Sequence, residues 1–170
     1  MKKENQKEKR MLSINIICPG KIKESYLKEA IAEYSKRLSK YCKLNIIEVP
    51  DEKVPEKLSE TVATEIKTRE GKMIINKIPK DTYLICLDLN GKELSSEDFS
   101  RKLEDISLNF NSSVTFIIGG TLGISDEVLD LSKEKICFSK MTFPHQLIRV
   151  FLLEQIFRAF KISNGETYHR

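Results

Sequence analysis

Three segments of this chain have the residue types of a ligand site, and each follows an apolar run. They are Leu87–Lys92, the glycine-rich Gly119–Gly123 (GGTLG) and the polar Phe138–Phe143 (FSKMTF), which Pro144 follows. Glycine has no Cβ, so a backbone can approach a ligand closely at such positions. For Gly119–Gly123 the sequence leaves two interpretations open, a plain tight turn and a loop that touches an adenosine or amino-acid moiety.

Histidine is scarce, because His145 and His169 are the two in the chain. A histidine side chain titrates at a pH of about 6.5 and can take up or release a proton near neutrality. His145 is either a plain surface or helix-start residue or part of a site. His169 lies in the terminal Tyr168-His169-Arg170, which is either a frayed end or part of a site.

Several common chemistries have no support in the residue spacing. The chain has no Walker loop, no G-x-G-x-x-G and no G-x-S-x-G elbow. Its four cysteines form no C-x-x-C pair and no histidines are spaced as ligands, so we expect no metal site. The remaining features suit a reaction whose electrophile is carried by a cofactor, while the protein positions and orients the reactants.

Strands and helices alternate along the chain and must position these segments. Strands are predicted at 12–18, 44–49, 82–89, 114–118 and 135–138, and helices at about 27–41, 56–77, after Ser95, after Ser125 and from Pro144 onward. Near-continuous apolar strands that alternate with helices predict an α/β fold, a parallel sheet with helices on both faces. Ligands bind outside the carboxyl ends of such strands, so we expect the three segments to converge on one pocket.

Two finer predictions concern glycines. Gly71 weakens the 56–77 helix by about 1 kcal/mol relative to alanine, so its second half is less certain. The inner face of that helix is expected to carry Leu58, Val62, Ile66 and Ile74. Asn90-Gly91 is predicted to form a turn after the third strand.

The last helix is apolar on most of its circumference. Its apolar residues are Leu147, Ile148, Val150, Phe151, Leu152, Leu153, Ile156, Phe157, Phe160 and Ile162. A helix of this kind must be covered on most of its surface. We therefore expect a second copy of the chain to supply part of the cover, which predicts a homodimer with the polar loop near its interface.

Composition limits the range of partners and compartments. Five basic residues and two glutamates in residues 1–10 account for +3 of the net charge of +4, which leaves +1 for the rest of the chain. The near-neutral body therefore has no overall basic signature of nucleic-acid binding. Buried-looking cysteines, no secretory signal and no run of about 20 apolar residues predict a cytoplasmic protein without a membrane span.

Residues 1–11 are predicted to be a disordered basic leader, and residues 12–170 a single domain. A basic arm that touches RNA is the alternative for the leader. Met11 directly precedes the first predicted strand and is a candidate natural start.

Six parts of the sequence together carry a resemblance to a known family. They are Phe138–Gln146 (FSKMTFPHQ) with Arg149 and Glu154-Gln155, the terminal Gly165–Arg170 (GETYHR), Ile117–Gly120 (IIGG), and Ile47–Lys53 (IEVPDEK). In this combination residues 11–170 resemble the SPOUT-class methyltransferases that act on N3 of a pseudouridine in large-subunit (23S) ribosomal RNA. The chain departs from the family pattern at Thr121-Leu122, and we expect little consequence.

The resemblance implies a SPOUT fold with a deep trefoil knot in the C-terminal half and S-adenosyl-L-methionine held by the knotted loops. The implied cofactor contacts are Leu87, Gly119, Phe138, Ser139, Lys140, Met141, Thr142 and Phe143. The implied assembly is a homodimer, and the implied acceptor is a pseudouridine of ribosomal RNA in the assembled ribosome.

The resemblance also implies that the C-terminal tail reaches the active site. His169 is then the candidate base for the N3 proton, and Tyr168 stacks on the acceptor base or hydrogen-bonds to it. Arg149 and Arg170 would grip phosphate or polarise the carbonyls of the acceptor. Two other functions stay open, a non-enzymatic ribosome- or RNA-binding protein of the same fold, and a SPOUT enzyme that acts on transfer RNA.

Overall fold

The computed structural model describes residues 11–110 and 112–168. Across these residues the strands form one parallel sheet in the order β2-β1-β4-β3-β5. The strands are β1 (Leu12–Pro19), β2 (Cys42–Val49), β3 (Tyr83–Glu93), β4 (Ser113–Ile118) and β5 (Glu134–Cys137). The predicted leader, apart from Met11, lies outside the described residues.

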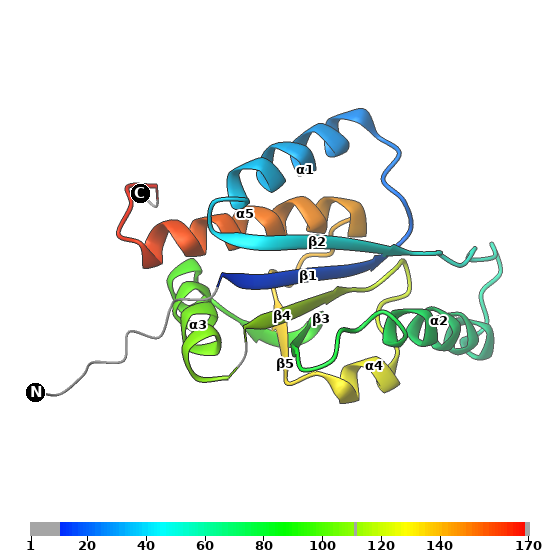
Figure 1. The fold of residues 1–170 in the computed structure, drawn as a ribbon. Coiled ribbons are helices and arrows are strands. Elements are labelled where there is room, and N and C mark those ends of the chain that lie inside the picture. The colour runs from blue at the N-terminus through cyan, green and yellow to red at the C-terminus, as the bar shows by residue number, and fades with distance from the viewer. Residues whose placement is uncertain (1–10, 111, 169–170) are drawn as a thin grey trace, which may run out of the picture.

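Helices cover both faces of the sheet, as predicted (Figure 1). One face packs against α1 (Ser25–Leu38), α3 (Ser96–Asn109) and α5 (His145–Ser163), and the other against α2 (Glu60–Ile75) and α4 (Asp126–Leu131). The α/β fold with a parallel sheet is therefore confirmed. The trefoil knot stays a prediction.

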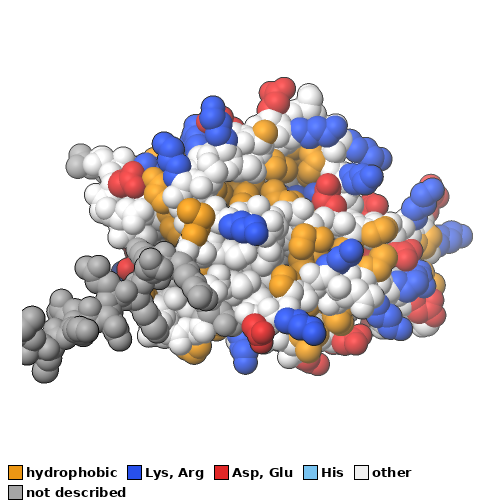
Figure 2. Space-filling view, viewed as in Figure 1, with side chains coloured by type: hydrophobic (Ala, Val, Ile, Leu, Met, Phe, Trp, Pro, Cys, Tyr) orange, Lys and Arg blue, Asp and Glu red, His pale blue; other side chains and the backbone are white. Residues whose placement is uncertain are grey.

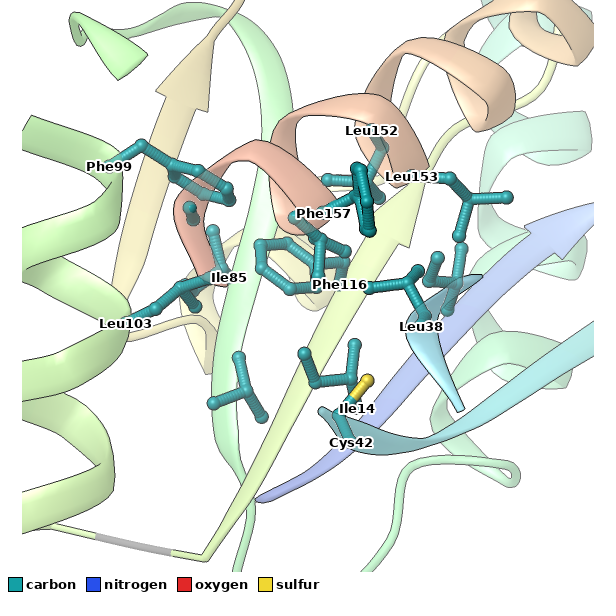
Figure 3. Packing of buried hydrophobic residues seen from close by; sticks show 14 of the residues in the cluster. Ile14, Leu38, Cys42, Ile85, Phe99, Leu103, Phe116, Leu152, Leu153 and Phe157 are labelled. Carbon is teal, nitrogen blue, oxygen red and sulfur yellow. The ribbon is translucent and has the colours of Figure 1, made fainter. Parts of the chain in front are cut away.

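The larger core lies between the sheet and α5 (Figure 3). Phe116 of β4 and Ile14 of β1 are fully buried there beneath Leu152 and Phe157 of α5. The Phe99 ring of α3 lies 6.0 Å from the Phe116 ring, measured between centroids. Burying one such side chain contributes about 1.5–3 kcal/mol, so this layer stabilises the packing of α5 on the sheet.

The predicted helix caps at Ser95 and Ser125 are confirmed. The Ser95 hydroxyl accepts a hydrogen bond from the Asp98 N–H at 3.0 Å, and the Ser125 hydroxyl accepts one from the Val128 N–H at 3.4 Å. Each cap satisfies a donor that the first helical turn leaves free. The second cap places the start of α4 directly after the glycine-rich segment.

Helix α2 corrects two details of the sequence prediction. It begins at Glu60, so Leu58 precedes the helix and is exposed rather than on its inner face. It also continues unbroken through Gly71 to Ile75. A Cβ at Gly71 would lie 2.2 Å from the Ser125 hydroxyl oxygen, so the glycine lets α2 pack closely against the start of α4.

The predicted Asn90-Gly91 turn is wrong, because β3 continues to Glu93. The pairing of β3 with β5 instead shifts register between Leu87 and Lys92. Such a shift depends on where a distant strand pairs, and local turn propensity carries no information about it.

Helix α5 is covered more completely within one chain than its composition suggests. It lies between α1 and α3 (Figure 1), and Leu152, Leu153 and Ile156 are fully buried. Phe151 stays exposed on its outer side.

On the face shown in Figure 2, basic and acidic side chains are interspersed, in keeping with the nearly neutral charge of the body. Within the described residues, no helix has the length and apolarity to cross a membrane.

Candidate active site

A cavity of about 860 Å³ lies at the carboxyl ends of β3, β4 and β5. All three segments singled out in the sequence line it, so their predicted convergence is confirmed. The lining consists of Leu87–Asn90, Ile118–Ile124, Ile136–Ser139, Met141–Gln146 and Ile148. The predicted contacts Leu87, Gly119, Phe138, Ser139, Met141, Thr142 and Phe143 are all among them. Lys140 is exposed and lies outside this lining.

The glycine-rich segment forms a closed turn directly after β4. The Gly123 N–H donates to the Gly120 carbonyl at 3.1 Å, and Gly123 has a φ of +89°. A Cβ at Gly119 would lie 2.7 Å from the Gly123 carbonyl carbon. Real Cβ atoms do not approach backbone that closely, so the turn can keep its shape only with glycine at position 119.

Behind this turn lies Glu70 of α2, a carboxylate that the sequence analysis did not single out. It is buried, and a Cβ at Gly120 would lie 2.9 Å from its Oε2 atom. Burial raises the pKa of Glu70 above its ordinary value, a backbone hydrogen bond from Glu52 opposes the shift, and the nearby Asp51 and Glu52 carboxylates add smaller increases. The side chain supports the turn from below and does not line the cavity.

The segment after β5 is held by its own hydrogen bonds. The Cys137 thiol donates to the Ser139 carbonyl at 3.0 Å, and the Ser139 hydroxyl accepts from the Met141 N–H at 3.0 Å. The Phe143 ring then meets the Phe151 ring edge-on, with centroids 5.4 Å apart. These contacts give the polar wall of the cavity a defined shape and tie it to α5.

His145 begins α5 and lines the cavity, half-buried. Burial lowers its pKa below the ordinary value of 6.5, the Arg149 cation lowers it further, and Asp51 opposes the shift. The imidazole is therefore neutral at pH 7 and can both donate and accept a hydrogen bond. The sequence left this residue open between two interpretations, and its place in the lining favours the functional one.

Arg149 lies elsewhere than its predicted role requires. Its side chain is 1% exposed, and Nη2 donates to the carbonyls of Pro19 and Gly20 at 2.7 Å each. Nη1 donates to Glu48 at 3.1 Å. The guanidinium ties the end of β1 to α5 and does not line the cavity, so the geometry favours a positioning role over a direct grip on substrate.

Tyr168 lies against the middle of α5, away from the cavity of its own chain. Its hydroxyl donates to Glu154 at 3.0 Å, and its ring meets the Phe157 ring edge-on at 5.1 Å. The Arg158 guanidinium carbon lies 4.8 Å from the centre of the Tyr168 ring. The other predicted tail residues, His169 and Arg170, lie outside the described residues.

The cysteines have the character of structural residues. All four are unpaired and buried, and burial raises the pKa of Cys18 and of Cys86 to about 11 and that of Cys42 to about 12. Thiols of this kind are unreactive near neutral pH. Among the described residues no group of histidine, cysteine, aspartate and glutamate side chains could hold a metal ion.

Comparison of the sequence with known proteins places this chain in a family. Residues 12–169 match the family model described as Predicted SPOUT methyltransferase. The chain is 55% identical to ribosomal RNA large subunit methyltransferase H of Clostridium perfringens and 57% identical to that of Clostridium tetani. Each alignment covers 94% of this chain and 100% of the relative. The chain belongs to the SPOUT methyltransferase family.

A solved structure shares this fold at low sequence identity. A probable methylase family protein from Haemophilus influenzae Rd KW20 superposes with a TM-score of 0.54 at 9% identity, covering 94% of this chain and 71% of that chain. At this identity the likeness concerns the fold alone. The family membership rests on the sequence matches, and the SPOUT resemblance stated from the motifs is confirmed.

Proposed function

We propose that the protein is an enzyme that transfers a methyl group from S-adenosyl-L-methionine to N3 of a pseudouridine in 23S ribosomal RNA of the assembled ribosome. The observation that carries the proposal is the identity of 55–57% over the full length of relatives named ribosomal RNA large subunit methyltransferase H. Two of the segments that carry the sequence resemblance, Ile117–Gly120 and Phe138–Gln146, contribute to the lining of the cavity.

The cavity fits a ligand of this kind. Its volume of about 860 Å³ lies within the range of about 300–1,000 Å³ typical of small-molecule sites. A Cβ at Gly119 would fall on the Gly123 backbone, so the turn that forms one wall requires glycine. Leu87, Gly119 and the residues of Phe138–Phe143 that line the cavity would hold the cofactor, whereas the exposed Lys140 lies outside the lining. When bound, S-adenosyl-L-methionine supplies an electrophilic methyl group on its sulfonium.

The chain's own task is then to orient the acceptor base and to accept the N3 proton. The turn at Gly119–Gly123 and the hydrogen-bonded wall after β5 limit the positions that two reactants can take, which accounts for a large part of the rate gain in such transfers. His169 remains the proposed proton acceptor, with Tyr168 and Arg170 at the acceptor base. Arg149 acts indirectly, by fixing α5 against β1.

A homodimer reconciles the tail with these roles. Tyr168 contacts Glu154, whereas Ile148 is the last residue of α5 that lines the cavity. Glu154 and Ile148 are about 9 Å apart along the axis of α5, at 1.5 Å per residue. We infer that the tail of one chain serves the cavity of its partner, and that the exposed Leu89, Met141 and Phe151 around the cavity contribute to the dimer interface.

The cytoplasm is the proposed compartment. It contains the assembled ribosome, and its reducing environment suits a chain whose four cysteines are all unpaired and buried.

Nucleoside mass spectrometry of ribosomal RNA from a deletion strain tests the proposal. The methylated pseudouridine should disappear from 23S ribosomal RNA and return when the intact gene is supplied. If a methylated nucleoside disappears from transfer RNA instead, the protein is a different SPOUT enzyme. Unchanged modification in both RNAs, together with no thermal shift of the protein on adding S-adenosyl-L-methionine, would support the non-enzymatic binder.

Removal of Tyr168–Arg170 tests the tail separately. We expect the truncated protein to bind S-adenosyl-L-methionine with nearly the affinity of the intact chain, because Tyr168 does not line the described cavity and the proposed place of the tail is at the acceptor base. Methylation of purified ribosomes should nevertheless fall by at least about a hundredfold, the usual effect of removing a general base. A wild-type rate would show that the tail has no part in the reaction.

A further inference from the structure

The segment between Leu87 and Lys92 leaves the regular ladder beside the cavity. Leu87 and Lys92 both pair with Ile136 of β5, so the residues between them have no partner positions of their own on that strand. Asp88, Leu89 and Asn90, which lie in this excursion, all line the cavity. Irregularities of this kind occur next to active sites, where they re-aim a side chain out of the sheet pattern.

The excursion is held firmly in place. A Cβ at Gly91 would lie 2.6 Å from the Ile136 backbone nitrogen, so the two backbones are in direct contact at that point. The Asp88 Oδ2 atom accepts a hydrogen bond from the Asn90 N–H at 3.2 Å. The ladder pairs at both ends fix the backbone of the excursion, and this internal hydrogen bond restrains the Asp88 side chain.

Asp88 gives the cavity its one carboxylate among the described lining residues, which include neither lysine nor arginine. The remaining polar side chains of the lining are neutral, because the pKa of His145 is lowered. Within the described part of the chain no cationic side chain pairs with Asp88 within 4 Å. A half-buried carboxylate in the lining of a ligand site, without a protein cation beside it, favours a ligand that carries positive charge.

We propose that Asp88 recognises the positive charge of bound S-adenosyl-L-methionine. This inference rests on the proposed function, because it requires that ligand in the cavity. The ligand carries two cationic groups, an ammonium that the demethylated product keeps and a sulfonium that becomes a neutral thioether when the methyl group leaves. A contact with the sulfonium would let the site release its product more readily than it releases its substrate.

Isothermal titration calorimetry with S-adenosyl-L-methionine and S-adenosylhomocysteine tests the inference. Asp88→Asn keeps the shape of the side chain and an oxygen that can accept from the Asn90 N–H, while it removes the charge. We expect it to weaken S-adenosyl-L-methionine binding by about tenfold, the loss of one charge-assisted contact. Asp130→Asn is the matched control, because Asp130 is exposed on α4 and outside the cavity lining.

The two ligands distinguish the two cationic groups. A loss confined to S-adenosyl-L-methionine assigns Asp88 to the sulfonium, and an equal loss for both ligands assigns it to the ammonium. An Asp88→Asn protein that melts like wild type and binds both ligands with wild-type affinity overturns the inference and leaves the proposed function standing. A wild-type protein that binds neither ligand overturns both.

Discussion

At the scale of single residues, close backbone approach determines the shape of the site more than any reactive side chain does. Gly119 lets its turn close on itself, and Gly91 lets β3 pass directly over Ile136. Gly71 lies outside the cavity wall, where α2 packs against the Ser125 cap of α4. The position of α4, and with it the end of the glycine-rich turn, therefore depends on a residue that contributes no side chain.

Gly71→Ala should destabilise the protein although alanine is the better helix former. The new Cβ would lie 2.2 Å from the Ser125 hydroxyl oxygen, and overpacking of this kind costs about 1–3 kcal/mol. The gain in helix propensity offsets about 1 kcal/mol of that cost. Urea unfolding measures the net loss.

Ser125→Ala supplies the control for this clash. It removes the hydroxyl and should itself cost about 1 kcal/mol through the lost cap. In that background Gly71→Ala should cost clearly less than it does in wild type, so that the two changes couple in a double-mutant cycle. Strictly additive effects would mean that the two residues do not interact as the structure shows.

His145 should make stability depend on pH near neutrality. Its folded-state pKa is lowered below 6.5 by burial and by Arg149, so the unfolded chain binds this proton first as the pH falls. The free energy of unfolding therefore decreases as the pH drops through about 6.5 toward the lower folded-state value. His145→Gln removes this titration and should flatten that part of the profile, measured by urea unfolding from about pH 7.5 to about pH 5.5. An identical slope in both proteins would contradict the lowered pKa.

The sequence predicted the segments that line the cavity better than it predicted the contacts of single side chains. The cavity segments were predictable because glycines and prolines after apolar strands mark the carboxyl rim of a parallel sheet. Arg149 was assigned to substrate because its type suits phosphate. Its actual partners, Pro19, Gly20 and Glu48, are far away in the sequence, and no local pattern points to them. The sequence did not single out Asp88, because its place in the cavity lining depends on the register with which β3 pairs with β5.

At the scale of elements, the start of α5 is held by one buried guanidinium. Arg149 joins α5 to the carbonyls at the end of β1, and its Nε has no hydrogen-bond partner among the described residues. His145, which lines the cavity, lies one helical turn before it. Any movement of this turn would therefore change the wall of the site.

Arg149→Met should destabilise the fold and disturb the cavity indirectly. It leaves two buried carbonyls without donors, and losses of this kind amount to about 3 kcal/mol in total. Thermal unfolding and S-adenosyl-L-methionine affinity should therefore both decline. A protein of wild-type stability whose KM for ribosomes alone is raised would instead support the direct grip on RNA.

Glu48→Gln separates the ion pair from the carbonyl contacts. The Glu48 side chain is 37% exposed, so water can compensate for much of the lost pairing. The change should cost less than about 1 kcal/mol, well below the loss for Arg149→Met. Equal losses in the two variants would show that the ion pair, and not the pair of carbonyl contacts, holds α5.

At the scale of the whole molecule, strand and helix alternation was enough to predict the class of fold. The composition of α5 led to the prediction of a dimer, yet α1, α3 and the sheet already cover most of that helix. The apolar surface left over is around the cavity, where Met141 is 73% exposed and Leu89 58%. Exposed apolar side chains gathered around a polar site mark a surface that another molecule covers.

Phe151→Asp should convert the proposed dimer into monomers. Phe151 is 36% exposed beside Phe143 at the edge of the cavity, and a twofold interface contains each residue twice. Burial of two such side chains contributes about 3–6 kcal/mol, so the loss weakens association by a factor of about a hundred or more. Sedimentation velocity over a range of concentrations measures the strength of association.

Leu108→Asp is the control for this change. Leu108 is 63% exposed in a groove between α3 and the end of α5, and the variant should remain dimeric. If Phe151→Asp associates as tightly as that control, the chains meet through another face, and the tail of one chain has no route to its partner's cavity.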